Sequence, residues 1–432
     1  MSWSEFQKVL PQTARVGSTG SLEIGGCDTI QLAAEFGTPV YILDLAEVRD
    51  RLRRYRDAFG GYNVFYASKV FLTKSFAKIV AEEDVGMECL AGGELYVALS
   101  GGFPPERIAL HGNNKSPEEL IQAIDAGVGR IVVDSFHELE MLRELTSERG
   151  VVQRILLRVT PGVEAHTHDY LVTGVEDTKF GFTIGEAAMR AIDMAARSDN
   201  LELAGLHSHI GSQIFDLKPF EEAARKMVRF LAEARRATAL EIPELDLGGG
   251  LGISYLPTDE AGSIEDLAKI VKEAVASEAE RAETEEPTIK VEPGRSIVGP
   301  AMLTLYTVGT VKDLANGSHY VAVDGGMSDN IRPALYQAQY TFLSALRPEA
   351  PHDRESAIAG KLCETGDILG RDVLLPSVEP GEIIACAGTG AYGYSMASNY
   401  NKQPKPAVVA VFGGERHVLA RRETFEDLVR LD

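Results

Sequence analysis

Short apolar runs alternate with longer segments of helical periodicity from about residue 64 to residue 295. This alternation is typical of βα units built around a parallel sheet. The apolar runs predict eight strands, at residues 64–69, 86–90, 107–112, 130–134, 154–159, 203–210, 244–250 and 288–294. Eight strands, each followed by a helix, match the size and rhythm of a (β/α)8 TIM-type barrel, so we predict an α/β fold.

Serine residues stand where two of the predicted helices begin. Ser116 precedes the segment PEELIQAIDAG, and Ser135 precedes FHELEMLRELTSE. A serine side chain at this position accepts a hydrogen bond from the first turn of a helix. We therefore expect both serines to be N-caps.

The helical rhythm stops after residue 300, and apolar runs alternate there with Gly and Pro turns. That pattern is typical of a β domain. Residues 1–37 contain two short β-like runs, around Leu22 and Ile30, and no barrel strand. We predict a barrel at residues 38–300 and a second, mainly β domain, a β-sandwich or β-barrel-like unit, formed by residues 1–37 together with 301–432.

The segment from Pro161 to Thr183 is longer than a usual βα connection and contains His166 and His168. One interpretation is a lid over the barrel mouth. The alternative is a solvated insertion without a role in the reaction, and the sequence favours neither.

Composition excludes several classes of protein. The 432 residues carry a net charge of −21, which repels phosphate backbones and anionic lipids, so we expect neither nucleic-acid nor membrane partners. No segment resembles a signal peptide or a membrane span, and we expect a cytoplasmic protein. The four cysteines are widely spaced without a CxxC pair, so we predict neither a metal site nor a disulfide framework.

Polar side chains end the predicted barrel strands, where barrel enzymes place their chemistry. The set comprises Lys69, Glu88, Asn113, Asp134, Arg158, His209 with Ser212, Gly248 to Gly250, and Glu292 with Arg295. Each has an ordinary alternative when taken alone: a surface lysine for Lys69, a tight turn for the glycines, and a surface ion pair for Glu292 and Arg295.

Two histidines at the end of the sixth strand receive different interpretations. His207 and His209 are two residues apart, so both would point to the same face of a strand. His209 is nearer the carboxyl end, and we assign it to a cofactor and His207 to the structure. A terminal lysine, a glycine loop, a stacking histidine and an acid are together the parts of a pyridoxal phosphate site.

These motifs resemble one family, the diaminopimelate decarboxylases, within the alanine-racemase-like pyridoxal-phosphate decarboxylases. The resemblance spans residues 37–406 and rests on YASK at 66–69, GGEL at 92–95, HGNNKSPEEL at 111–120, TG at 173–174, KFGF at 179–182, HSHIGSQI at 207–214, GGGLG at 248–252, EPGRSIVG at 292–299, RPALY at 332–336, CETGD at 363–367 and GAYGYSMASNYN at 390–401.

The resemblance implies roles for the residues in these motifs. Lys69 would be the aldimine lysine that binds pyridoxal 5'-phosphate covalently, and His209 would stack on its ring. Glu292 would pair with the pyridine nitrogen, which makes the ring an electron sink for decarboxylation. The residues implied around the phosphate are Ser212, Gly248, Gly249, Gly250, Gly294, Arg295 and Tyr392.

The resemblance also implies the substrate, meso-2,6-diaminopimelate, which would lose CO2 to give L-lysine in the last step of lysine biosynthesis. Arg295, Arg332 and Tyr336 would bind its distal carboxylate, with Tyr392 nearby, and Glu364 its distal ammonium. Cys363 would guide protonation after CO2 leaves. In this family Cys363 and Glu364 reach the neighbouring subunit's site, which implies a homodimer with shared active sites.

Two alternatives stay open from sequence: another decarboxylase of the same fold, acting on ornithine, arginine or lysine, and a catalytically silent homologue that binds without turnover. The sequence also departs from the family pattern, because Glu88 and Ala91 stand where Asp and Ser are usual. These departures concern the hydrogen bonds near Lys69.

Overall fold

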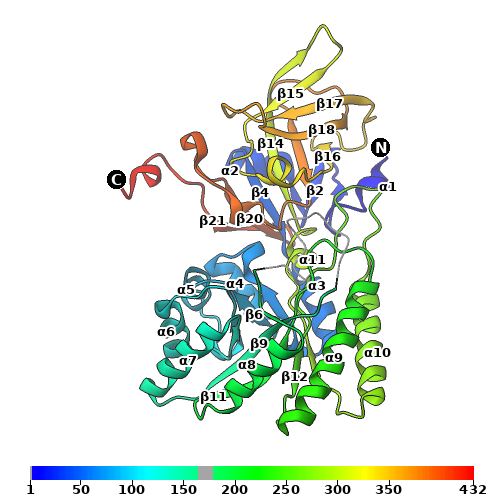
Figure 1. Cartoon of the computed structure of the whole chain (residues 1–432). Coiled ribbons are helices and arrows are strands. Elements are labelled where there is room, and N and C mark those ends of the chain that lie inside the picture. The colour runs from blue at the N-terminus through cyan, green and yellow to red at the C-terminus, as the bar shows by residue number, and fades with distance from the viewer. Residues whose placement is uncertain (1, 164–178) are drawn as a thin grey trace. The chain divides into compact units, whose positions relative to one another are not determined.

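The computed structural model describes residues 2–163 and 179–432 (Figure 1). Contacts divide the chain into two compact units. The barrel unit comprises Leu52–Gly252 and Ala261–Gly294, and the β unit comprises Met1–Arg51, Ile253–Glu260 and Arg295–Asp432. Both units are therefore assembled from separate stretches of the chain.

Eight parallel strands, in chain order, form the sheet of the barrel unit. Hydrogen bonds from Phe65 N to Val291 O (2.8 Å) and from Ala67 N to Pro293 O (3.1 Å) join the last strand to the first. The sheet thus closes on itself, and the predicted TIM-type barrel is confirmed. The strands are β5 (Phe65–Ala67), β6 (Gly86–Cys89), β7 (Ile108–Leu110), β8 (Arg130–Val133), β9 (Gln153–Thr160), β11 (Leu201–His207), β12 (Glu244–Asp246) and β13 (Thr288–Lys290), with the short β10 (Phe182–Thr183) beside β9.

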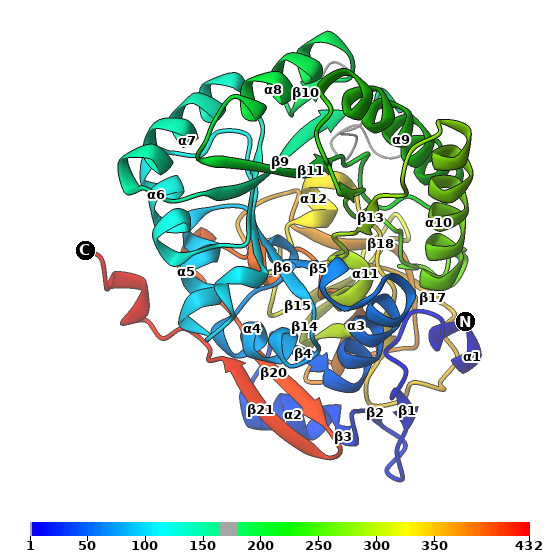
Figure 2. The ribbon, with the colours of Figure 1, turned by 90° about the horizontal axis from the view of Figure 1, so that it is seen from below.

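Helices surround these strands, as Figure 2 shows for α4 to α10. Every residue of β6 and β7 is buried, as expected of parallel strands covered on both faces. Ser116 Oγ accepts from Glu119 N (3.3 Å) and Ser135 Oγ from Glu138 N (3.2 Å), which confirms both predicted N-caps. The helices are α3 (Leu45–Phe59), α4 (Lys74–Ala81), α5 (Gly92–Ser100), α6 (Pro117–Ala126), α7 (Phe136–Arg149), α8 (Glu186–Ala196), α9 (Lys218–Thr238) and α10 (Ile264–Arg281).

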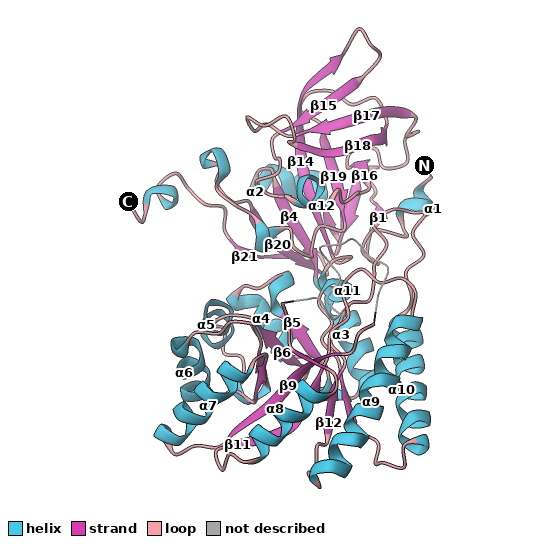
Figure 3. Cartoon of the chain, viewed as in Figure 1, coloured by secondary structure: helices cyan, strands magenta, loops and turns pink. Residues whose placement is uncertain are grey.

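The β unit is built on a nine-stranded mixed sheet, drawn in magenta in Figure 3. The strand of this sheet that comes first in the chain, β4 (Val40–Asp44), lies between β14 and β20 near the middle of the sheet. All its residues are buried. The other strands are β14 (Met302–Asp313), β15 (His319–Val323), β16 (Phe342–Ser344), β17 (Arg354–Ala359), β18 (Ile368–Leu375), β19 (Ile383–Ala387), β20 (Ala407–Phe412) and β21 (Glu415–Ala420). Two short helices, α11 (Arg295–Val298) and α12 (Arg332–Tyr336), carry candidate site residues.

The amino-terminal segment packs onto this sheet. Phe6, Leu22 and Leu32 share a buried apolar cluster with Leu303 of β14 and Val409 of β20. The segment contributes α1 (Trp3–Phe6), α2 (Thr29–Phe36) and a three-stranded sheet of β1 (Arg15–Val16), β2 (Leu22–Ile24) and β3 (Cys27–Asp28).

The borders of the two units differ in detail from the division expected at residues 38–300. Residues 38–51 belong to the β unit because β4 pairs with β14 and β20. Residues 253–260 belong to it because Ile253 and Tyr255 pack into one of its buried apolar clusters. Of the long segment 161–183, residues 164–178 lie outside the described residues, so the lid interpretation is not tested. No helix in the described part of the chain is long and apolar enough to cross a membrane.

Candidate active site

Lys69 lies directly after β5, in a single 3-10 turn (Ser68–Val70) at the carboxyl end of the strand. Its Nζ is 2.7 Å from Glu88 Oε1, at the end of the neighbouring strand β6. The Glu88 side chain is 3% exposed, whereas that of Lys69 is 34% exposed. Glu88, where the family usually has Asp, is therefore long enough to form an ion pair with Lys69.

Glu292 follows β13 and is buried between two histidines. His207 Nε2 and Glu292 Oε2 form a hydrogen bond of 3.0 Å, and His111 Nε2 lies 2.7 Å from Glu292 Oε1. Burial alone would raise the pKa of Glu292, but the two histidines lower it well below its usual range. The carboxylate is therefore ionised.

Asp246, at the end of β12, is the next acid in this region. It is the cross-strand neighbour of His207, and its Oδ1 accepts from Gly248 N at 2.9 Å. Burial, followed by repulsion from Glu292, raises the pKa of Asp246 to about 8. Two buried acids thus hold one negative charge near neutral pH, and Glu292 carries it.

His209 lies just beyond β11, beside the glycine loop. Its Nδ1 accepts a hydrogen bond from Gly249 N (3.3 Å). Desolvation, with the positive charges of Lys69 and Arg158, lowers the pKa of His209 well below its usual range. A neutral imidazole fixed at one nitrogen is suited to stacking on an aromatic ring.

The predicted glycine loop does not offer all its amides to a ligand. Gly248 N donates to Asp246 and Gly249 N to His209, so these two amides already have partners inside the protein. Gly248 has φ +66° and Gly250 has φ +125°, conformations that favour glycine. Gly250 is thus the best placed of the three for a phosphate contact.

Arg158 and Asp134 form a second charged pair at the barrel rim. Arg158 Nε is 3.8 Å from Asp134 Oδ2, and both side chains are buried. Asp134 Oδ1 accepts from Gly181 N (2.9 Å), which ties the chain after the undescribed segment to β8. We interpret this pair as part of the framework, and it keeps a positive charge near Glu292.

In the β unit, two arginines that are 37 positions apart share one phenol. Arg295 Nη1 donates to Tyr255 Oη at 2.6 Å, and Arg332 Nη1 donates to the same oxygen at 3.0 Å. Arg332 Nη1 also donates to Tyr340 Oη at 2.6 Å. Both arginines are buried, so this cluster holds two positive charges close together. The phenol oxygens of Tyr255 and Tyr340 accept their hydrogen bonds.

Tyr336 and Tyr392 flank these arginines. The Arg332 guanidinium carbon lies 5.9 Å from the centre of the Tyr336 ring, and that of Arg295 lies 5.0 Å from the Tyr392 ring. Contacts of this kind stabilise a buried cation and restrict its orientation. The predicted residues Arg295, Arg332, Tyr336 and Tyr392 are thus brought together within the β unit.

Cys363 and Glu364 lie on the exposed loop between β17 and β18. Cys363 N donates to Asn401 Oδ1 (2.9 Å), and Tyr400 Oη donates to Glu364 Oε1 (2.7 Å). Asp367 anchors the loop, since its carboxylate accepts from Leu362 N (2.7 Å). The loop therefore presents a thiol and a carboxylate at the surface in a defined conformation.

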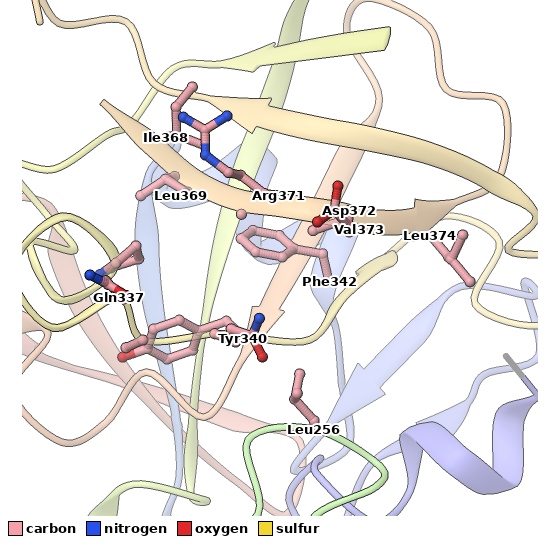
Figure 4. Close-up of a pocket in the computed structure, with 14 residues that line it drawn as sticks. Leu256, Gln337, Tyr340, Phe342, Ile368, Leu369, Arg371, Asp372, Val373 and Leu374 are labelled. Carbon is pink, nitrogen blue, oxygen red and sulfur yellow. The ribbon is translucent and has the colours of Figure 1, made fainter. Parts of the chain in front are cut away.

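A pocket of about 580 Å³ lies in the β unit (Figure 4), and Pro333 of α12 is among its lining residues. Its wall comes mainly from β18 and residues 337–342, and it contains none of the predicted site residues. Tyr340, which accepts a hydrogen bond from Arg332, is one of the lining residues.

The rim of the barrel fits pyridoxal phosphate. Glu292 Oε1 completes no hydrogen bond of ordinary geometry among the described residues, so it can accept one from a protonated ring nitrogen. A Cβ on Gly294 would lie 2.9 Å from Ala67 Cβ, so only glycine allows the backbone to approach β5 this closely. An amine, an ionised carboxylate, a neutral imidazole and a glycine loop all meet at one end of the barrel. The fold and site therefore define a barrel-type pyridoxal-phosphate decarboxylase.

Comparison with known proteins agrees. Residues 45–299 match the family described as "Pyridoxal-dependent decarboxylase, pyridoxal binding domain". Diaminopimelate decarboxylase of Bacillus subtilis is 48% identical and that of Mycobacterium tuberculosis 47%, with 97% or more of both chains covered in each case. The crystal structure of the M. jannaschii diaminopimelate decarboxylase superposes with a TM-score of 0.91 at 34% identity, over 98% of both chains. The chain belongs to the diaminopimelate decarboxylase family.

Family membership confirms the predicted resemblance to the diaminopimelate decarboxylases, the barrel fold and the pyridoxal phosphate cofactor. The roles assigned to individual residues stay predictions. The sequence patterns did not indicate a role for Tyr255, Tyr340 or His111. They assigned His207 to the structure but did not predict that it contacts Glu292. The aromatic residues near Arg332 were the available signal, but only the folded chain brings Tyr255 to them.

Proposed function

We propose that the chain decarboxylates meso-2,6-diaminopimelate to L-lysine and CO2, with pyridoxal phosphate as cofactor, in the last step of lysine biosynthesis. The observation that carries this proposal is the pair of buried arginines, Arg295 and Arg332, joined by Tyr255. Paired guanidinium groups are suited to a carboxylate, and diaminopimelate has a distal carboxylate that ornithine and lysine lack.

The barrel unit would hold the cofactor, which when bound withdraws the electron pair left behind as CO2 departs. Lys69 would supply the amine for covalent attachment, and His209 would pack against the ring. Glu292 would pair as a carboxylate with the ring nitrogen. The phosphate is assigned to Gly250, Gly294 and Arg295, with Ser212, Tyr392 and the rest of the Gly248–Gly250 loop around it.

The β unit would select the substrate by charge. Arg332, Arg295 and Tyr336 bind the distal carboxylate, and Glu364 binds the distal ammonium. Tyr400 donates to Glu364 Oε1 (2.7 Å), which leaves the other carboxylate oxygen for the substrate. Cys363 is positioned next to Glu364 to deliver the proton that replaces CO2.

We also assign a homodimer with shared sites. Cys363 and Glu364 are exposed in the described chain, whereas the arginines are buried. Exposed residues held by Asn401, Tyr400 and Asp367 are suited to completing the active site of a second copy.

A substrate panel tests the proposed reaction. We expect CO2 release from meso-diaminopimelate and little from ornithine or L-lysine, and we expect Arg332→Ala to remove that preference. Arg332→Lys is the matched control, because it keeps the charge but not the forked hydrogen bonds. Equal turnover of ornithine by the wild type would favour the alternative decarboxylase, and absence of turnover with bound cofactor would favour a silent homologue.

Mixing of inactive variants tests the dimer. Lys69→Ala and Glu364→Ala chains, each inactive alone, would exchange subunits to give mixed dimers with one intact site. At equal mixing, half of the dimers are mixed, so recovery should approach about a quarter of wild-type activity. No recovery after demonstrated exchange would contradict shared sites.

A further inference from the structure

The contacts of Glu292 raise a question that the proposed function leaves open, namely how a fully buried carboxylate keeps its charge and orientation. Burial alone disfavours the ionised form. The carboxylate accepts one hydrogen bond from His207 at 3.0 Å and lies 2.7 Å from His111, and both imidazoles are buried. The two rings meet edge to face, with centres 4.9 Å apart.

The strand topology places these side chains together. His207 is the last residue of β11, His111 follows β7, and Glu292 follows β13, so three separate strands converge at the carboxyl end of the barrel. Arg158 from β9, Asp246 from β12 and His209 beyond β11 are further titratable or charged groups near Glu292. A carboxylate in this position has little freedom to rotate, because His207 holds Oε2 through a hydrogen bond and the His111 ring lies against Oε1.

The tautomer of His207 follows from its contacts. Nε2 faces Glu292, whereas Nδ1 is buried and has no hydrogen-bond partner among the described residues. A proton on Nε2 satisfies the one available contact, and a proton on Nδ1 would leave a buried donor unpaired. His207 therefore acts as a donor to Glu292 Oε2.

We propose that His207 and His111 are positioning residues that hold Glu292 as an oriented carboxylate, with one lone pair of Oε1 directed at the ring nitrogen of the cofactor. His207 acts through its hydrogen bond, and His111 acts through the close approach of its Nε2 to Oε1 (2.7 Å). This inference rests on the proposed role of Glu292, and neither histidine needs to touch the cofactor.

The test compares His207→Phe, which removes the donor, with His207→Gln, whose side-chain amide can replace Nε2. The readouts are the affinity of the cofactor-stripped full-length chain for pyridoxal phosphate and the NMR chemical shift of the isotope-labelled ring nitrogen, which reports its protonation. Because a hydrogen bond to a charged group is lost, His207→Phe should bind the cofactor roughly 10- to 100-fold more weakly. The ring nitrogen of the cofactor bound to this variant should be less protonated. His207→Gln should restore most of the affinity and most of the protonation.

A double-variant cycle with Glu292→Gln separates positioning from packing. If His207 acts through Glu292, His207→Phe should add little further loss in the Glu292→Gln background. His352→Phe is the control for removal of a buried imidazole, because His352 packs against Phe6 in the β unit. If His207→Phe does not fold, His111→Leu and His111→Gln provide the same cycle.

Three outcomes would overturn the proposal. An equal loss from His207→Phe with and without Glu292→Gln would mean that His207 only fills space. An unchanged nitrogen shift in His207→Phe would mean that Glu292 needs no support. An unchanged affinity and shift in Glu292→Gln itself would refute the assigned role of Glu292, and with it this inference, while leaving the substrate assignment to the panel experiment.

Discussion

Tyr255→Phe is the most informative single substitution in the β unit. It removes one hydroxyl oxygen that accepts hydrogen bonds from Arg295 (2.6 Å) and Arg332 (3.0 Å), and it leaves the aromatic ring in place. Burial would raise the pKa of Tyr255, but the two arginines lower it, because both guanidinium groups favour the ionised form of the phenol. Its loss should therefore disturb the position of both guanidinium groups.

The magnitude follows from the number and kind of the bonds. Each hydrogen bond to a charged group contributes about 1.5–3 kcal/mol. Arg332 keeps its bond to Tyr340 Oη (2.6 Å), so part of its orientation survives. We expect a loss of about 2–4 kcal/mol in transition-state stabilisation, which corresponds to a decrease in kcat/KM for diaminopimelate of about 30- to 1000-fold.

Steady-state decarboxylation is the assay, with cofactor affinity and thermal unfolding measured in parallel. Tyr340→Phe is the graded comparison, because it removes a bond to Arg332 alone and should cost less activity than Tyr255→Phe. A folded Tyr255→Phe enzyme whose kcat/KM stays within about threefold of wild type would refute the idea that this hydroxyl organises the arginine pair.

The remaining predictions concern the cofactor, pH and stability. Lys69→Ala should lack the visible absorbance of the covalently bound cofactor, and a retained band would move the attachment to another amine. Burial raises the pKa of Asp329 to about 7, so the native chain keeps a proton that the unfolded chain releases above about pH 4, and stability falls as pH rises through this window. Asp329→Asn should remove that contribution in denaturant unfolding at several pH values, and identical pH slopes would contradict it. Arg130→Ala should destabilise the barrel by about 2–3 kcal/mol in urea unfolding, because the buried Glu244 loses its two short hydrogen bonds from Arg130 (2.7 and 2.6 Å) and keeps only the longer contacts to Arg154 (3.5 Å) and Lys290 (3.8 Å); a change below about 1 kcal/mol would argue against a strong pair.

Local patterns made the barrel predictable. Parallel strands covered by helices are buried on both faces, so β7 is a continuous apolar run and β6 is interrupted only by Glu88. The caps at Ser116 and Ser135 depend on neighbours three residues away, and a sequence contains that information directly. Lys69 was then a candidate because it stands at the end of a predicted strand, and no tertiary contact was needed to identify it.

Contacts between distant segments were not predictable in this way. Tyr255 and Arg332 are 77 positions apart in the sequence, and no local sequence pattern around either residue predicts their hydrogen bond. The contact of His207 with Glu292 was not predictable because strand alternation was extended to His209, whereas β11 ends at His207. Beyond that point the chain no longer alternates between two faces, and only the fold decides which ring meets Glu292.

The place of β4 in its sheet constrains how the protein can be made. This strand leaves the ribosome early, yet both of its neighbours, β14 and β20, are synthesised after the barrel, and β20 begins at Ala407. Until β20 is synthesised, the five residues of β4, four of them apolar, lack the complete set of hydrogen-bonded neighbours that bury them in the finished sheet. Chains that stop before β20 should therefore aggregate or be degraded, even when their barrel is complete.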